Sequence, residues 1–186
     1  WEEQFHFSDI AQARRSVMAA VRESFEETGI LLAGEDEQDV VERSSTPELM
    51  AWREAVAAQD KSFSDFLTSS GLSVRADLLR PVARWQSPDF FLKRYDIAYF
   101  STALPVGQDP KLLLGKGVWG DWLNVRELLE AKDTSELGDR IGQPNTVGRT
   151  LDQLITPGVM CLLESLAKAQ TSVAWLSKRR KIEVKK

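Results

Sequence analysis

The sequence predicts a mixed α/β fold, and two patterns carry this prediction. An alanine-rich amphipathic stretch over 8–29 has helical periodicity, whereas 94–104 has the alternation and aromatic content of a strand, and 78–85 is also typical of a strand. The chain has 186 residues, of which 42% are hydrophobic and six are Trp, so it can bury a sizeable core. We expect one domain over 1–170, followed by the end of a C-terminal helix and a basic tail over 171–186.

The first long helix has recognisable signals at both ends. Ser8 is a suitable N-cap, and Asp9 falls in the first turn, where a negative charge favours the helix dipole. Gly29 is suited to the left-handed residue that ends a helix. The face predicted to meet the sheet consists of Ile10, Ala13, Val17, Ala20, Val21 and Phe25.

Three carboxylates gather in the last turns of this helix. Glu23, Glu26 and Glu27 stand at i, i+3 and i+4, so their side chains share one face. Like charges at that spacing repel one another, which indicates that a cation offsets them, and oxygen ligands suit Mg²⁺ or Mn²⁺. Arg22 is placed to orient a neighbouring carboxylate. The alternative is an ordinary acidic helix face in contact with water.

A helical insertion is predicted over about 34–75. Residues 34–45 are polar and acidic and indicate a loop or a mobile segment. Thr46 followed by Pro47 predicts the start of a second helix, and a third short helix extends from Phe63 to Gly71. The insertion has two open interpretations, a lid over a site or the surface of a homodimer.

The remaining elements are expected in a regular order. Asn124 is a predicted N-cap, Cys161 lies on an apolar helix face and is expected to be a buried thiol, and Ile182 with Val184 suggests an edge strand. The other predicted elements are a weak strand at 119–123 and helices at 125–132, 146–155 and 157–169.

The acidic turn resembles a known signature. Arg22, Glu23, Glu26, Glu27, Gly29 and Ile30 match in register the R-E-U-x-E-E-x-G-U motif of the Nudix hydrolases, where U is a bulky apolar residue. Ser24 departs at a U position, and Ser8 and Arg14 stand where the full signature has Gly and Glu. The resemblance implies an α/β/α sandwich with a mixed sheet, a helical insertion and extra C-terminal helices. It also implies that the N-terminal strands lie ahead of Trp1.

Downstream motifs are similar to one branch of that family. Trp85, Ser87 and Pro88 form a Trp-x-Ser-Pro loop, and 94–96 (Arg-Tyr-Asp) opens an aromatic strand that ends at 104–105. This order resembles the peroxisomal coenzyme A diphosphatase type and its actinobacterial relatives. Where relatives carry a Glu before the Trp of the third strand, residues 115–118 read Gly-Lys-Gly-Val.

The resemblance implies Mg²⁺- or Mn²⁺-dependent hydrolysis of a pyrophosphate bond in a nucleoside diphosphate linked to another group, with a coenzyme A ester or a dinucleotide as the leading substrate. Glu26 and Glu27 are the first choices as metal ligands, Glu23 is a third ligand or the base, and Arg22 orients them. Two alternatives remain, a weakened Nudix-fold binding module and a helical interaction protein. Other candidate bases are Glu130, Asp133 and Glu136, and candidate phosphate contacts are Arg84, Lys93 and Arg94.

Composition excludes several other classes. The net charge of −4 argues against a general nucleic-acid binder, and a nine-residue basic end at 178–186 is typical of a solubilising terminus. No apolar run reaches the ~18–20 residues of a membrane span. One His, His6, is too few for a His-ligated zinc site or a Ser-His-Asp triad. One cysteine excludes an internal disulfide, and the default is a cytoplasmic protein with a small-molecule partner.

Overall fold

A computed structural model describes residues 2–90, 92–113, 115–180, 182 and 184–185. The chain divides into two compact units, which are described separately: residues 1–120 with 181–186, and residues 121–180. The boundary between the units falls inside the predicted domain over 1–170, which stays a prediction. From the predicted basic tail, Lys181, Glu183 and Lys186 lie outside the described residues.

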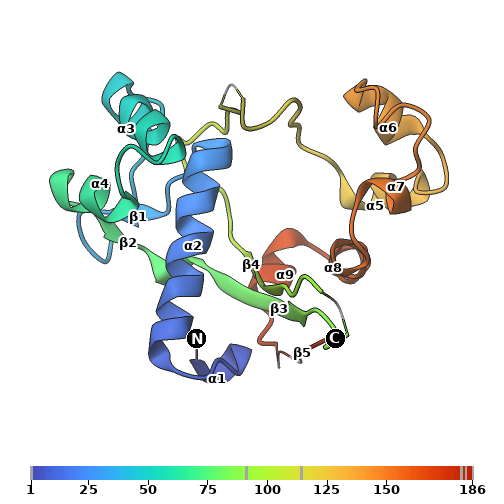
Figure 1. The fold of residues 1–186 in the computed structure, drawn as a ribbon, viewed down its shortest axis with the longest axis horizontal. Coiled ribbons are helices and arrows are strands. Elements are labelled where there is room, and N and C mark those ends of the chain that lie inside the picture. Colours follow the sequence, from blue (N-terminus) through green and yellow to red (C-terminus); the bar gives the residue numbers. More distant parts are fainter. Residues whose placement is uncertain (1, 91, 114, 181, 183, 186) are drawn as a thin grey trace. The chain divides into compact units, whose positions relative to one another are not determined.

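The first unit combines helices with two small sheets (Figure 1). Its helices are α1 (Glu2–Phe5), α2 (Ile10–Thr28), α3 (Pro47–Ala57), α4 (Phe63–Ser69) and the 3₁₀ turn η1 (Ala76–Leu78). Its strands are β1 (Ala33–Gly34), β2 (Ser73–Val74), β3 (Arg80–Gln86), β4 (Asp96–Ser101) and β5 (Val184–Lys185).

The larger sheet confirms the two predicted aromatic strands and the edge strand. β3 lies in the centre, with β4 antiparallel on one side and β5 parallel on the other. The register pairs Arg84 of β3 with Ala98 of β4 and with Val184 of β5, so the C-terminal segment returns to the sheet. In the smaller sheet, β1 pairs with β2 in an antiparallel ladder.

The long helix forms as predicted, with a shift at its start. Asp9, not Ser8, is the N-cap, because its carboxylate accepts the Gln12 amide at 2.7 Å. At the other end Gly29 has φ +77° and its amide bonds the Phe25 carbonyl at 3.0 Å, which confirms the predicted stop. Ile10, predicted on the buried face, is 60% exposed because it opens the first turn.

The hydrophobic core lies between α2 and the insertion. Figure 1 shows α3, α4 and the β1–β2 ribbon near the C-terminal end of α2, and α1 at its other end. Phe25 stacks on Phe66 of α4, with ring centroids 5.1 Å apart, and Leu31 is fully buried beside them. Both predicted insertion helices are confirmed, and Thr46 caps the first through the Leu49 amide at 3.3 Å. A smaller cluster joins Phe5, Phe7, Ala13 and Ile182.

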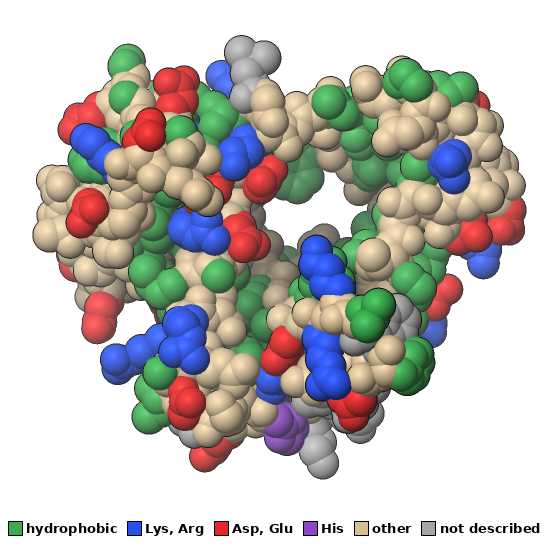
Figure 2. All heavy atoms as spheres, in the orientation of Figure 1, with side chains coloured by type: hydrophobic (Ala, Val, Ile, Leu, Met, Phe, Trp, Pro, Cys, Tyr) green, Lys and Arg blue, Asp and Glu red, His purple; other side chains and the backbone are tan. Residues whose placement is uncertain are grey.

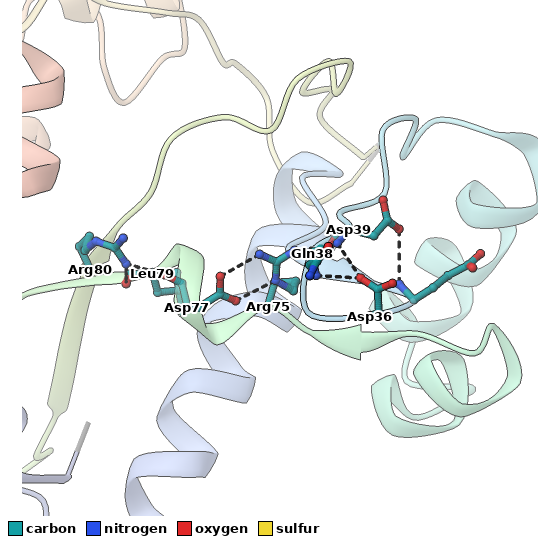
Figure 3. Close-up of polar contacts among 8 residues, drawn as sticks. Asp36, Gln38, Asp39, Arg75, Asp77, Leu79 and Arg80 are labelled. Carbon is teal, nitrogen blue, oxygen red and sulfur yellow. Dashed lines mark hydrogen bonds and ion pairs between the residues drawn. The ribbon is translucent and has the colours of Figure 1, made fainter.

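The acidic segment after β1 is a loop, as predicted, and polar contacts hold it (Figure 3). The Asp36 carboxylate accepts the amides of Gln38 and Asp39 at 2.7 and 2.9 Å. Arg75 donates to the Asp39 carbonyl and also forms a two-pronged ion pair with Asp77, at 2.8 Å for each contact. A Cβ at position 34 would lie 2.1 Å from the Asp39 carbonyl oxygen, so this close turn requires Gly34.

The second unit is helical in the part that the structure describes. Its elements are α5 (Val125–Glu130), α6 (Glu136–Ile141), α7 (Leu151–Leu154), α8 (Pro157–Ala167) and α9 (Ser172–Ser177). Asn124 caps α5 through the Arg126 amide at 3.0 Å, as predicted. The helix predicted over 146–155 is reduced to α7, because Gly148 turns the chain with φ +75°.

Two further expectations for this part of the chain are wrong. No strand forms over 119–123, a segment that pairs with no strand among the described residues. Cys161 is exposed instead of buried. Helix α8 packs against α5, and its exposed positions include Cys161, Glu164 and Ser165, which share one side of the helix.

The surface carries mixed charge. On the face drawn in Figure 2, acidic and basic side chains are interspersed, without a large block of either sign among the residues described. Within the same residues, no helix has the length and apolar character needed to cross a membrane.

Candidate functional site

The acidic turn occupies the last two turns of α2, and its three glutamates differ in exposure. Glu26 is buried, with 7% of its surface exposed, and it directly follows the core residue Phe25. Glu23 and Glu27 are exposed. The structure therefore offers two carboxylates that reach solvent and one held at the edge of the core.

Arg22 joins two of these carboxylates. Its Nη1 donates to Glu26 Oε1 at 2.5 Å, and its Nη2 lies 3.4 Å from Glu23 Oε1. The contact between the guanidinium and the Glu26 carboxylate is a charge-assisted hydrogen bond. The orienting role of Arg22 stays a prediction, and this contact is the geometry that the role requires. The contact also shows that Glu23 and Glu26 can approach one positive charge together.

The three glutamates are not gathered into a ready metal centre. Within the described residues, no group of three or more His, Cys, Asp or Glu side chains lies close enough together to hold a metal ion. The carboxylate of Glu26 faces Arg22, and Glu27 is turned to solvent. The donors nevertheless suit Mg²⁺ or Mn²⁺ in type, since carboxylate oxygens are the ligands that these hard cations prefer. Cation binding at this turn would therefore require the glutamate side chains to rearrange.

A buried arginine beneath the turn was not predicted. Arg53 of α3 is 0% exposed, and its Nε and Nη2 donate to the Glu26 carbonyl at 3.1 and 3.0 Å. Its Nη2 also donates to the Lys111 carbonyl at 2.8 Å. The sequence gives only a weak signal that this Arg is buried, because it lies in a helix whose apolar residues are Leu49, Trp52 and Val56. Its partners lie 27 and 58 residues away in the chain.

A second unpredicted residue, Gln108, ties the 105–111 loop to the segment after α2. Gln108 is 5% exposed; its Oε1 accepts the Leu31 amide at 2.8 Å, and its Nε2 donates to the Leu31 carbonyl at 2.9 Å. The same nitrogen donates to the Val41 carbonyl at 2.6 Å. The amide side chain therefore satisfies backbone groups that no sheet partner reaches.

A groove of about 480 Å³ lies between α2 and β4, and Glu23 borders it. Its helix side carries small residues, which leaves the space open, and its strand side runs from Asp96 to Phe100. Ser24, the residue that departs from the signature, also lines this groove. The groove is large enough for a small organic group beside the acidic turn.

Of the basic residues suggested as phosphate contacts, Arg84 has a structural role. It is 4% exposed, forms a two-pronged pair with Asp96 at 2.7 and 2.5 Å, and donates to the Phe5 carbonyl at 2.9 Å. Lys93 and Arg94 are exposed, Lys93 over the Tyr95 ring and Arg94 donating to the Asp89 carbonyl. The candidate bases Glu130, Asp133 and Glu136 are exposed in the second unit.

Comparison with known proteins identifies the fold. No protein-family model matches the sequence, and no curated protein matches it. The crystal structure of a Nudix hydrolase from Alicyclobacillus acidocaldarius superposes with a TM-score of 0.65, over 96% of this chain and 72% of that chain. The fold is that of a Nudix hydrolase. At 20% identity the likeness concerns the fold alone, and it confirms the predicted mixed α/β, Nudix-like architecture.

Within this Nudix-like fold, the acidic turn is the best candidate site of the first unit. It combines three carboxylates, an arginine that bridges two of them, a buried arginine beneath, and an adjoining groove. The metal-ligand roles of Glu23, Glu26 and Glu27 and the relation to the coenzyme A diphosphatase branch stay predictions.

Proposed function

We propose that the protein hydrolyses a pyrophosphate bond with the help of Mg²⁺ or Mn²⁺. The substrate class is a nucleoside diphosphate linked to another group, with a coenzyme A ester or a dinucleotide as the leading candidate. The observation that carries this proposal is the acidic turn at the end of α2, with Glu23, Glu26 and Glu27 on a Nudix-like fold.

Each residue of the turn has a role in this chemistry. A bound divalent cation neutralises the charge of the diphosphate and lowers the pKa of coordinated water. Glu26 and Glu27 supply the oxygens that hold the cation, and Arg22 orients Glu26 through the bond at 2.5 Å. Glu23 is exposed at the groove, where it can act as a third ligand or accept the proton of the attacking water.

The groove supports a substrate with a group attached to the diphosphate. Tyr99 and Phe100 on β4 offer aromatic surface, and Glu23 stands at the border. A group lying along β4 places its diphosphate near the acidic turn. The helix side is lined by Ser16, Ala19 and Ala20, which leave room for that group.

A hydrolysis panel tests the proposal. Wild type is assayed with Mg²⁺ over coenzyme A, NADH, ADP-ribose and nucleotide sugars, beside Glu26→Gln and Glu27→Gln. Glu35→Gln, an exposed carboxylate outside the turn, is the matched control. We expect turnover of at least one substrate by wild type and control, and a loss of about 10²-fold or more in the two turn variants. Equal turnover by all four proteins refutes the assignment.

A binding module with weakened turnover is the second candidate. It is favoured by the absence of a preassembled cluster of three metal-ligating side chains in the described residues. Such a module is stabilised against heat by cation and diphosphate without releasing product. Its partner is still a small molecule, and the single, exposed Cys161 favours a reducing compartment such as the cytoplasm.

A further inference from the structure

Arg53 connects three segments that are distant in the sequence. It belongs to α3 of the insertion, and its guanidinium is bonded both to Glu26 in the acidic turn and to Lys111 in the loop after β4. A second hydrogen bond joins the same loop to α2, because the Lys111 amide donates to the Thr28 carbonyl at 2.8 Å. The end of α2 is thereby attached to the loop at two points, one of them through Arg53.

The chemistry of this contact is specific to an arginine. The last carbonyls of a helix have no partner inside the helix, and the helix dipole favours a cation there. Two N–H groups of Arg53 converge on the Glu26 carbonyl while one also reaches Lys111, which requires a planar fork of donors. Burial lowers the pKa of Arg53, and the negative charges of Glu27 and Glu54 offset only part of this effect.

Gly29 and the Arg53 guanidinium are in close contact. Gly29 packs directly on the guanidinium, because a Cβ at this position would lie 3.0 Å from Arg53 Nη1. The glycine of the acidic turn therefore serves two requirements at once, the left-handed backbone at φ +77° and room for the arginine.

We propose that Arg53 is a positioning residue for the cation site of the acidic turn. By holding the Glu26 carbonyl and the Lys111 carbonyl together, it fixes the backbone from which the Glu26 and Glu27 side chains reach a shared cation. This inference rests on the proposed function. It gives α3 of the insertion a supporting role at the site. This role is additional to the two interpretations that the sequence left open, a lid or the surface of a homodimer.

The test compares Arg53→Lys with Arg75→Lys. The first variant keeps the charge and removes the fork; the control makes the same change at another arginine that donates to a backbone carbonyl of the first unit. Manganese affinity is measured from the electron paramagnetic resonance signal of free Mn²⁺, and hydrogen exchange of the Lys111 amide is followed by NMR. Because outer-shell partners of metal ligands change affinity by about 10–100-fold, we expect at least tenfold weaker binding and faster Lys111 exchange in Arg53→Lys only.

The outcomes separate the two proposals. If wild type and Arg53→Lys bind Mn²⁺ equally while the Lys111 amide loses protection, Arg53 only fastens the loop and the positioning role is refuted. If wild type binds no Mn²⁺, the metal-dependent function fails, and the positioning role with it. If Arg53→Lys does not fold, Gly29→Ala displaces the guanidinium without removing it, with Gly71→Ala as control, and the same weaker binding is expected.

Discussion

Arg22 and Glu26 lie one helical turn apart on α2, and the Arg22 guanidinium donates to the Glu26 carboxylate at 2.5 Å. The Glu26 side chain is only 9% exposed. The same guanidinium lies 3.4 Å from Glu23. A positive charge thus stands between two of the three glutamates. Any divalent cation at this turn shares the Glu26 carboxylate with Arg22 or displaces Arg22 from it.

Replacement of Arg22 tests its orienting role. In Arg22→Gln the Glu26 carboxylate loses its fixed partner, and we expect Mg²⁺-dependent turnover to fall by about 10–100-fold. Stability is expected to fall by about 1–2 kcal/mol, because Arg22 is partly exposed but the Glu26 side chain that loses its charged partner is only 9% exposed. Arg14→Gln, at an exposed position of the same helix, is the control. Equal turnover by both variants contradicts the orienting role.

The Arg84–Asp96 pair predicts a pH dependence of stability. Hydrogen bonding to Arg84 lowers the pKa of Asp96, and Gln86 adds to this effect against the opposing effect of burial. A carboxylate whose pKa is lower in the folded than in the unfolded protein stabilises the fold. This stabilisation is fully present above the unfolded-state pKa of about 3.9, and it is lost as the pH falls through the folded-state pKa.

The measurement compares Asp96→Asn with wild type in urea at pH 7 and at pH 3 and below. At pH 7 we expect the variant to be less stable by about 1–3 kcal/mol, because the buried Arg84 loses its charged partner while keeping its bonds to Phe5 and His6. The difference shrinks below about pH 3.9, as wild-type Asp96 becomes protonated. A difference that is constant from pH 7 to pH 2 contradicts this account.

Gly29 and Gly71 provide a matched pair of left-handed glycines. Both have positive φ, +77° and +65°, but a Cβ meets Arg53 only at position 29 and has open space at position 71. Gly71→Ala is expected to cost about 1 kcal/mol from backbone strain alone. Gly29→Ala is expected to cost more, because Arg53 must also shift. If thermal or urea unfolding shows the same decrease in the free energy of unfolding for both variants, the contact between Gly29 and Arg53 does not contribute to stability.

Removal of the Gln108 amide is expected to loosen the 105–111 loop. Gln108→Ala leaves the Leu31 amide and carbonyl and the Val41 carbonyl without this partner, and we expect a loss of about 2–4 kcal/mol. The exposed Gln38→Ala is the control and should change stability by less than about 0.5 kcal/mol. A similar urea midpoint for both variants means that water replaces the lost bonds.

Local features of the sequence predicted the end of α2, the insertion helices and the two central strands. Gly29, Thr46 and Asn124 act through neighbours within a few residues, so their roles are visible in the chain itself. The alternation over 94–104 carried the same local information for β4. Arg22 belongs to this group as well, since its partners are one and four residues away.

The features that sequence reasoning missed depend on long-range contacts. Arg53 and Gln108 are defined by carbonyls that lie 27 to 77 residues away, and no periodicity marks them. The exposure of Cys161, in contrast, has a local cause: Glu164 and Ser165 follow it by three and four residues, so it belongs to the polar side of α8. The strand predicted over 119–123 is wrong because a short apolar segment does not by itself provide a neighbouring strand.

The most direct test of the account is anomalous diffraction at the manganese edge from crystals grown with Mn²⁺. We predict a peak beside the Glu26 and Glu27 carboxylates, with metal–oxygen distances of roughly 2.0–2.2 Å, close to those of Mg²⁺. Glu23 lies at or next to the same ion. A map without a peak at the end of α2, with Glu26 still bonded to Arg22 and Glu27 in solvent, contradicts the proposal.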